Sequence, residues 1–218
     1  MEPKVVVVVG VGPGVGAAVA RRFGTDGYDV ALIARSATHL EELGTELQEA
    51  GVTAGWTAVD IADSDALAAA VTRFGGHLGQ IDVVHFNPSV FREADPLQLS
   101  PDQLLEDVRV GAAGLLTVVQ AARPFMRAGS RVLATGSMAA DHPSPGACSL
   151  GVQKAALRNL VLSLDRALSP DGIRAATLTV HGVLAADTPF SPARVADAVH
   201  ALATTPDAQW RAEVGYDG

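Results

Sequence analysis

The chain is poor in cysteine, in charged residues and in long apolar runs. One of its 218 residues is cysteine, 18% are charged, and the net charge is −8. The single cysteine, Cys148, excludes an internal disulfide and a metal site built from cysteines. The acidic balance, with no basic patch, argues against nucleic acid as a partner. The apolar run Val5 to Val9 is too short for a membrane span and lacks a signal-peptide layout.

These shortages favour a soluble, cytoplasmic protein without a metal site. Hydrophobic residues make up 48% of the chain, which is enough for a sizeable core. No linker-like segment and no repeat divides the sequence. We therefore expect a single domain over residues 1–218, with a small molecule as its substrate.

Short β-branched segments alternate with longer segments rich in alanine and leucine. This alternation predicts a doubly wound, Rossmann-like α/β fold, with a seven-stranded parallel sheet flanked by helices. Strands are expected at 4–9, 28–34, 53–59, 81–86, 130–135, 173–180 and 211–215, and helices at 14–24, 37–50, 63–74, 101–127, 148–169 and 192–203.

A glycine-rich turn joins the first predicted strand to the first predicted helix, in the order Gly10-Val-Gly12-Pro-Gly14-Val15-Gly16. At such a junction the helix N-terminus attracts a pyrophosphate, and glycines allow it to approach closely. A glycine-rich turn alone is weak evidence, but its position between strand and helix strengthens the prediction of a nucleotide site.

The spacing of these glycines resembles that of the short-chain dehydrogenase/reductase family, and the resemblance extends over most of the chain. It implies a nicotinamide coenzyme whose diphosphate lies against Gly10, Gly14, Val15 and Gly16. The resemblance to this family also implies that the protein is an oxidoreductase.

The second predicted strand ends at Ala34 and is followed by Arg35 and Ser36. In the family, an acidic residue at the end of this strand would bind the ribose hydroxyls of NAD. Ala34 cannot do so, whereas Arg35 can pair with a 2′-phosphate. This favours NADP(H) over NAD(H). The alternative is that Arg35 is a solvated arginine in a turn.

Two further segments resemble coenzyme-binding positions of the family. Asp60 and Ile61 resemble the pair that contacts the adenine. Asn87 is the one residue kept from the family's Asn-Asn-Ala-Gly turn, so its amide is expected to line the groove.

The resemblance identifies Ser137 as the serine that polarises the substrate oxygen and Lys154 as the lysine that binds the nicotinamide ribose. The family's proton donor is a tyrosine four residues before that lysine, and Leu150 stands there. A leucine side chain can neither donate nor accept a proton. A positioned acid contributes roughly 10²–10⁴-fold to rate, so slow turnover is expected unless another group substitutes.

A second departure falls at Gly111, where the family has an asparagine that supports the proton relay. Paired changes predict that the ordinary relay is lost; the alternative is a helix shifted in register. We expect Leu150→Tyr alone to restore little reductase activity, and Leu150→Tyr with Gly111→Asn to restore more.

His181 is a candidate substitute acid, because it occupies the place of the family's Pro-Gly beside the nicotinamide and histidine titrates near neutrality. His142 is a weaker candidate, and both are also typical of plain loop residues. Thr188 resembles the threonine that contacts the carboxamide. The segment that should close over the substrate is nearly missing.

The resemblance implies an atypical NADP(H)-dependent oxidoreductase acting on a carbonyl or alcohol. Two alternatives stay open: an inactive nucleotide-binding scaffold or regulatory subunit, and a non-redox enzyme on the same fold. The family also implies a homodimer or homotetramer paired through 101–127 and 148–169.

Overall fold

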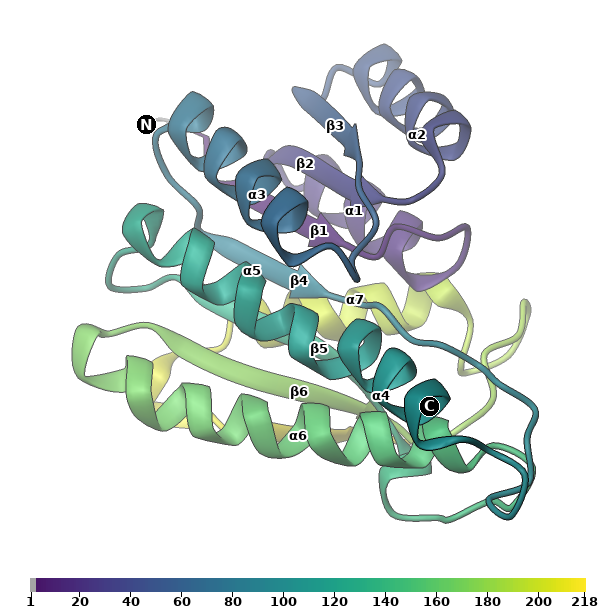
Figure 1. Cartoon of the computed structure of the whole chain (residues 1–218). Helices are drawn as coiled ribbons and strands as arrows, with labels where there is room; N and C mark the ends of the chain where they lie inside the picture. The colour runs from purple at the N-terminus through teal and green to yellow at the C-terminus, as the bar shows by residue number, and fades with distance from the viewer. Residues whose placement is uncertain (1–2) are drawn as a thin grey trace.

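The computed structural model describes residues 3–218 as a seven-stranded sheet with helices on both faces (Figure 1). The strand order is β3-β2-β1-β4-β5-β6-β7, and every neighbouring pair is parallel. The predicted doubly wound fold is confirmed. The strands are β1 (Val5–Val9), β2 (Asp29–Ala34), β3 (Ala54–Ala58), β4 (Val83–Phe86), β5 (Arg131–Ser137), β6 (Arg174–Val180) and β7 (Glu213–Tyr216).

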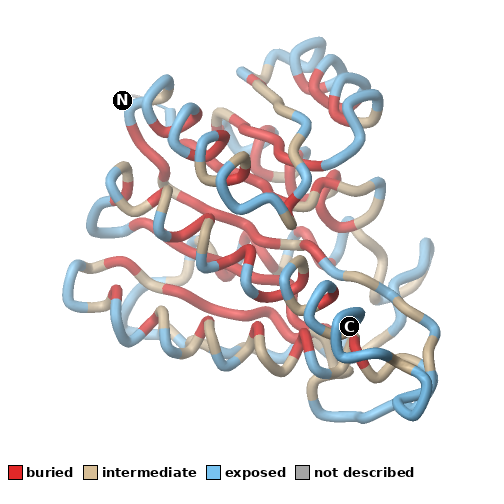
Figure 2. The backbone as a smooth tube through the Cα atoms, in the orientation of Figure 1, coloured by how far each residue is buried: buried red, intermediate tan, exposed pale blue. Residues whose placement is uncertain are grey.

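The helices form two layers that bury the sheet between them. One layer shares a core with the face of the sheet that carries Val6, Val8 and Leu133, and the other covers the face with Val7 and Val9. Figure 2 shows the strands buried and the outer helix surfaces exposed. The first layer holds α1 (Val15–Thr25), α2 (Ala37–Glu49) and α7 (Pro192–Ala203); the second holds α3 (Ser64–Leu78), α4 (Pro101–Val108), α5 (Gly114–Ala122) and α6 (Cys148–Leu168).

Helix starts follow from local chemistry. Ser100 caps α4 by accepting a hydrogen bond from the Gln103 N–H, and the Gln103 side chain returns a bond to the Ser100 N–H. Pro101 occupies the first helical position, where its missing N–H costs nothing. Asp63 caps α3 by accepting a hydrogen bond from the Ala66 N–H at 3.0 Å. Serine and aspartate are typical cap residues because their side-chain oxygens accept from the free N–H groups of the first turn.

The expected continuous helix over 101–127 is wrong in its middle and at its end. After α4, residues 109–113 form a π-helical turn, and α5 then continues to Ala122. A short 3₁₀ turn containing Pro124 ends the segment. The interruption is centred on Gly111, whose missing side chain loosens the helix. Such π turns often accompany functional sites.

Within residues 3–218, none of the helices is long and apolar enough to cross a membrane.

Candidate active site

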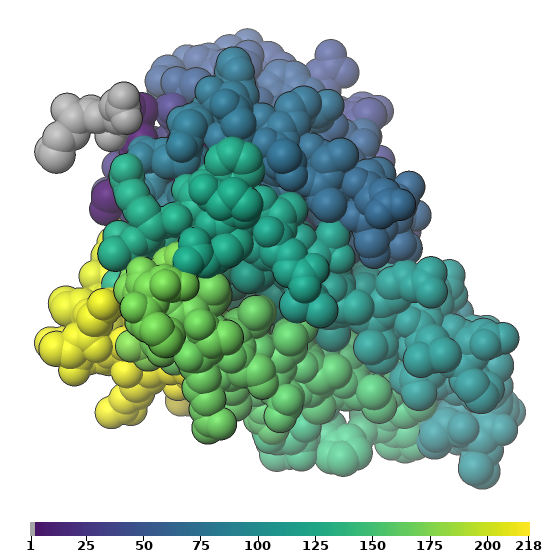
Figure 3. Space-filling view, turned by 60° about the vertical axis from the view of Figure 1, so that its left-hand side comes forward, coloured from purple at the N-terminus to yellow at the C-terminus, as the bar shows by residue number. Residues whose placement is uncertain are grey.

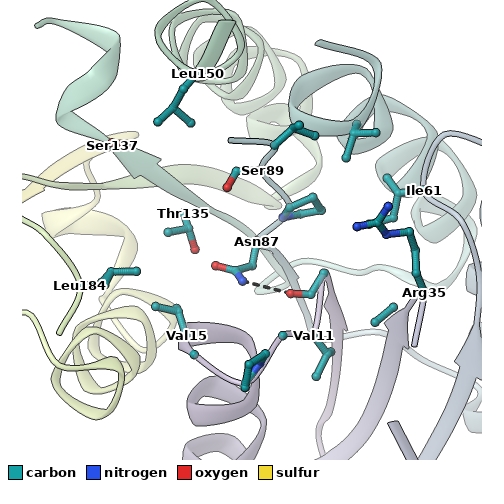
Figure 4. Close-up of a pocket in the computed structure, with 18 of the residues that line it drawn as sticks. Val11, Val15, Arg35, Ile61, Asn87, Ser89, Thr135, Ser137, Leu150 and Leu184 are labelled. Atoms are coloured by element: carbon teal, nitrogen blue, oxygen red, sulfur yellow. Dashed lines mark hydrogen bonds between the residues drawn. The ribbon is translucent and has the colours of Figure 1, made fainter. Parts of the chain in front are cut away.

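The carboxyl ends of the strands border a groove of about 820 Å³ (Figure 4). The chain leaves β1 toward β2 on one side, while β4 lies on the other side of β1. Ligands of doubly wound sheets bind at this type of switch point, because the connecting loops diverge there and leave a crevice. The groove is therefore where a nucleotide is expected.

The turn after β1 is held against the end of β4. Gly10 has a φ of +84°, which L side chains rarely adopt, and a Cβ there would lie 2.7 Å from the Pro88 nitrogen. The Asn87 side-chain amide donates to the Gly10 carbonyl oxygen at 3.0 Å. Asn87 therefore both lines the groove and fixes the glycine turn.

The other glycines of the turn divide into two kinds. A Cβ added at Gly12 or Gly14 would meet nothing within 4 Å, so both face open space in the groove. Gly16 is tightly packed, because a Cβ there would lie 2.8 Å from the Gly10 carbonyl oxygen. Among the predicted diphosphate residues, Gly10, Gly14 and Val15 line the groove, and Gly16 packs the helix behind it.

Helix α1 begins at this turn without a side-chain cap from any described residue. Of its first N–H groups, that of Ala17 donates to the Gly12 carbonyl oxygen at 3.1 Å, and those of Val15 and Gly16 have no side-chain partner among the described residues. An uncapped helix N-terminus beside open glycines is suited to a phosphate group.

One end of the groove, next to the end of β2, is lined by Arg35, Ser36 and His39. The Ser36 hydroxyl accepts a hydrogen bond from the His39 N–H at 3.3 Å, which caps α2. Arg35 is exposed and reaches the groove beside Ile61 in Figure 4. Sequence reasoning missed His39, which could have been found from its position one helical turn after Arg35.

Asp60 and Ile61 also line this end of the groove, as the sequence predicted for an adenine contact. An Asp60 carboxylate oxygen accepts a hydrogen bond from the Ala62 N–H at 3.0 Å, which orders the turn. Ile61 is buried, and its methyl group packs closely against Gly114 of α5. Asp60 and Ile61 therefore offer one polar and one apolar contact to a group bound at this end of the groove.

Ser137 and Lys154 come together at the far end of the groove. Ser137 ends β5, and its hydroxyl accepts a hydrogen bond from the Ala139 N–H at 3.2 Å. The buried Lys154 amine donates to the Thr135 carbonyl oxygen at 2.9 Å and to the Pro88 carbonyl oxygen at 3.4 Å. Burial lowers the pKa of Lys154 to about 8.

A family profile described as short chain dehydrogenase matches residues 4–191. The chain belongs to this family. The short-chain dehydrogenase resemblance suggested by the glycine turn is thereby confirmed.

Individual relatives agree with this assignment. The chain is 32% identical over 204 residues to the cyclic-di-GMP-binding biofilm dispersal mediator protein of Escherichia coli, covering 91% of this chain and 81% of that protein. It is 30% identical over 178 residues to a short chain dehydrogenase of Pseudocercospora fijiensis, covering 79% of this chain but 57% of that protein. A short chain dehydrogenase of Burkholderia cenocepacia, solved in complex with NADP, superposes with a TM-score of 0.91 at 26% identity, covering 99% and 96% of the two chains.

Leu150 lines the groove at the position where the resemblance to short-chain dehydrogenases placed a tyrosine. Among the described residues that line the groove, none is a tyrosine. Tyr28 is buried in the core, and the Tyr216 hydroxyl donates to the Pro189 carbonyl oxygen. Neither phenol replaces the one that the family uses.

Gln153 fills the space beside Gly111. A Cβ at Gly111 would overlap the Gln153 side-chain carbonyl oxygen. That oxygen accepts a hydrogen bond from the Val90 N–H at 3.0 Å, and the Gln153 amide donates to the Val90 carbonyl oxygen at 2.8 Å. The fully buried glutamine thus ties the loop after β4 to helix α6. An asparagine at position 111 would have to displace the Gln153 amide group from its hydrogen bonds to Val90.

His181 and Thr188 lie elsewhere than sequence reasoning expected. His181 does not line the groove; its Nδ1 pairs with Asp217 at 2.8 Å, and its ring packs against Gly215 of β7. His181 follows the last residue of β6 and its ring lies beside β7, whereas the neighbouring Val180 lines the groove. We therefore do not retain His181 as the substitute acid.

Thr188 lies in the segment between β6 and α7, on a second cavity of about 860 Å³ next to α1. Its hydroxyl donates to the Ala185 carbonyl oxygen and accepts from the Phe190 N–H. These local bonds make Thr188 part of a turn. Thr188 does not line the groove of Ser137 and Lys154, but its cavity adjoins that groove at Pro13 and Gly14.

Proposed function

We propose that this chain is an oxidoreductase that binds NADP(H) and acts slowly on a carbonyl or alcohol. The observation that carries the proposal is the groove itself. Open glycines and an uncapped helix face one part of it, and Ser137 and Lys154 face another. Membership in the short-chain dehydrogenase family and the NADP complex of the Burkholderia relative support the same proposal.

The residues present fit a dinucleotide carrying a 2′-phosphate. Gly12 and Gly14 leave the space that a diphosphate needs. Arg35 offers an exposed guanidinium for a 2′-phosphate, with His39 beside it. Lys154 would hold the nicotinamide ribose through its buried amine. When bound, the coenzyme supplies hydride transfer to or from the nicotinamide.

The chain's own contribution to the chemistry is incomplete. Ser137 can orient a carbonyl oxygen by hydrogen bonding. Leu150 offers no proton, and Gln153 occupies the space beside Gly111, where the family resemblance led us to expect the relay asparagine. We therefore expect slow turnover, with the proton taken from water.

Titration of the protein with NADPH and NADH, followed by NADPH consumption with a panel of carbonyl substrates, tests this proposal. We expect micromolar NADPH binding, weaker NADH binding, and slow but measurable turnover of at least one substrate. Absence of NADPH binding would remove the proposal altogether.

A second candidate function is nucleotide binding without turnover, in a regulatory role. Leu150 favours it, and so does the Escherichia coli relative, which is named for cyclic-di-GMP binding. Competition between cyclic-di-GMP and NADPH separates the two candidates. Displacement of NADPH by cyclic-di-GMP, with no turnover of any carbonyl, would favour the regulatory role.

We further propose that two copies pair through 101–127 and 148–169. These segments adjoin on one surface in Figure 3, in teal and green. Large apolar side chains are exposed on both, including Leu105, Leu116 and Val152. Light scattering of the purified protein should give at least twice the 22.4 kDa chain mass. Val152→Glu should reduce that mass, and Val183→Glu, at an exposed position outside both segments, should not.

A further inference from the structure

A fully buried histidine lies behind the wall of the groove. His85 is in β4, where its neighbours across the sheet are Val8 of β1 and Leu133 of β5. Its Nε2 is 3.0 Å from the hydroxyl oxygen of Thr135. Its Nδ1 is buried and has no hydrogen-bond partner among the described residues. Burying a polar ring in such apolar surroundings costs free energy unless its nitrogens are hydrogen-bonded.

The protonation state of His85 follows from its surroundings. Burial, with the positive charge of Lys154, lowers the pKa of His85 to about 3. The imidazole is therefore neutral at neutral pH and carries one N–H. If that hydrogen were on Nδ1, a buried donor would be orphaned, which proteins avoid more strictly than an unpaired acceptor. The hydrogen therefore belongs on Nε2, which donates to Thr135.

This assignment determines what Thr135 can do. A threonine hydroxyl has one hydrogen to donate and two lone pairs. One lone pair accepts from His85, so the O–H hydrogen is not used by that bond. Thr135 lines the groove near Ser137 and Lys154, and in Figure 4 it lies between Ser137 and Asn87. Its β-branched side chain is stiff at χ1, which holds the hydroxyl in place.

We propose that Thr135 is a ligand-binding hydroxyl of this groove, and that His85 is the positioning residue that keeps it a hydrogen-bond donor. The acceptor is an oxygen at the Ser137 end of the groove, from the coenzyme or from the substrate. The inference rests on the proposed NADP(H)-dependent function. It adds a polar contact that the family resemblance did not indicate.

The state of His85 can be tested without any ligand. Proton–nitrogen correlation NMR on protein with nitrogen-labelled histidine reports the tautomer of each of the six histidines. The His85→Gln variant assigns the signal. We expect a neutral ring protonated at Nε2 that does not titrate down to pH 5. A ring protonated at Nδ1, or a ring that becomes charged in this range, would overturn the positioning role.

Removal of the hydroxyl tests the ligand contact. Thr135→Val keeps the side-chain shape, and we expect it to weaken NADPH binding by roughly 5–30-fold, the usual cost of one lost hydrogen bond to a ligand. Thr135→Ser should return the affinity to within about threefold of wild type. Binding of 2′,5′-ADP, which lacks the nicotinamide half, should stay unchanged in both variants.

The matched control is Thr177→Val, one strand away. Thr177 is fully buried, its hydroxyl has no partner among the described residues, and it does not line the groove. Its removal should leave NADPH binding unchanged. His85→Leu should weaken binding less than Thr135→Val, and the double variant should be no weaker than Thr135→Val alone, because both act on one contact.

The same variants distinguish whether the acceptor oxygen belongs to the coenzyme or to the substrate. A weaker NADPH affinity assigns the oxygen to the coenzyme. An unchanged NADPH affinity with a raised KM for the carbonyl substrate assigns it to the substrate. If Thr135→Val alters neither quantity while wild type binds NADPH, this inference fails and the proposed function stands. If wild type does not bind NADPH, the proposed function fails as well.

Discussion

The two ends of the groove differ in how closely they follow the short-chain dehydrogenase pattern. At the phosphate end, the open positions Gly12 and Gly14 and the left-handed turn at Gly10 leave the space that a diphosphate needs. At the Ser137 end, the groove is lined by Leu150, which cannot donate a proton, and Gln153 occupies the space beside Gly111. Binding of a coenzyme and protonation of a substrate are thus separable properties, because they depend on different side chains.

The largest effect should come from filling the phosphate end. Gly12→Leu places a side chain in open space, so it should fold normally yet weaken NADPH binding by about 100-fold or more. Gly76→Leu is the matched control, because it also meets nothing within 4 Å but lies on the exposed side of α3. Calorimetric titration measures both. Equal affinity of Gly12→Leu and wild type would show that this end does not hold the diphosphate.

The next effect should come from Arg35. Arg35→Ala removes the guanidinium expected to pair with the 2′-phosphate, and a charge-assisted hydrogen bond contributes about 1.5–3 kcal/mol. NADPH affinity should therefore fall by roughly 10–100-fold, while NADH affinity changes little. An equal loss of NADPH and NADH affinity would mean that Arg35 does not bind the 2′-phosphate.

At the other end, Leu150→Tyr places a phenol one helical turn before Lys154, on the same side of α6. We expect NADPH turnover to rise by less than about tenfold, below the range of a fully positioned acid. A rise of three orders of magnitude would show that the two ends differ by a single side chain.

The structure corrects the expectation that Gly111→Asn helps Leu150→Tyr. An asparagine there would overlap Gln153, and overpacking costs about 1–3 kcal/mol. The double variant should therefore be less stable than Leu150→Tyr in urea unfolding, and no more active. Adding Gln153→Ala makes room, and that triple variant should exceed the double in turnover. Higher turnover of the double variant would show that Gln153 moves aside readily.

The smallest effect is a pH dependence from Lys154. Its pKa of about 8 lies below the ordinary value of 10.5, so the unfolded chain binds more protons between these two values. Stability from this group therefore rises with pH from about 8 to 10.5. Relative to Lys154→Met, wild type should gain on the order of 1 kcal/mol in free energy of unfolding between pH 8 and pH 9. If the difference in free energy of unfolding between the two proteins were the same at pH 8 and pH 9, Lys154 would be charged over this whole pH range.

Sequence reasoning recovered what depends on local patterns. The seven strands and the glycine turn are readable from residue types and spacing. It failed where side chains distant in sequence meet. Gln153 and Gly111, or His85 and Thr135, are partners separated by tens of residues, and nothing in either segment alone indicates the other.

The amino-acid sequence by itself determined the doubly wound fold, the position of the glycine turn and the absence of a phenol four residues before Lys154. These features depend on periodicity and on covalent identity, which are local. Only the tertiary structure decided that His181 pairs with Asp217, that Gln153 fills the space beside Gly111, and that His85 is hydrogen-bonded to Thr135. Those outcomes depend on strand register and helix packing, because these bring distant side chains within hydrogen-bonding distance.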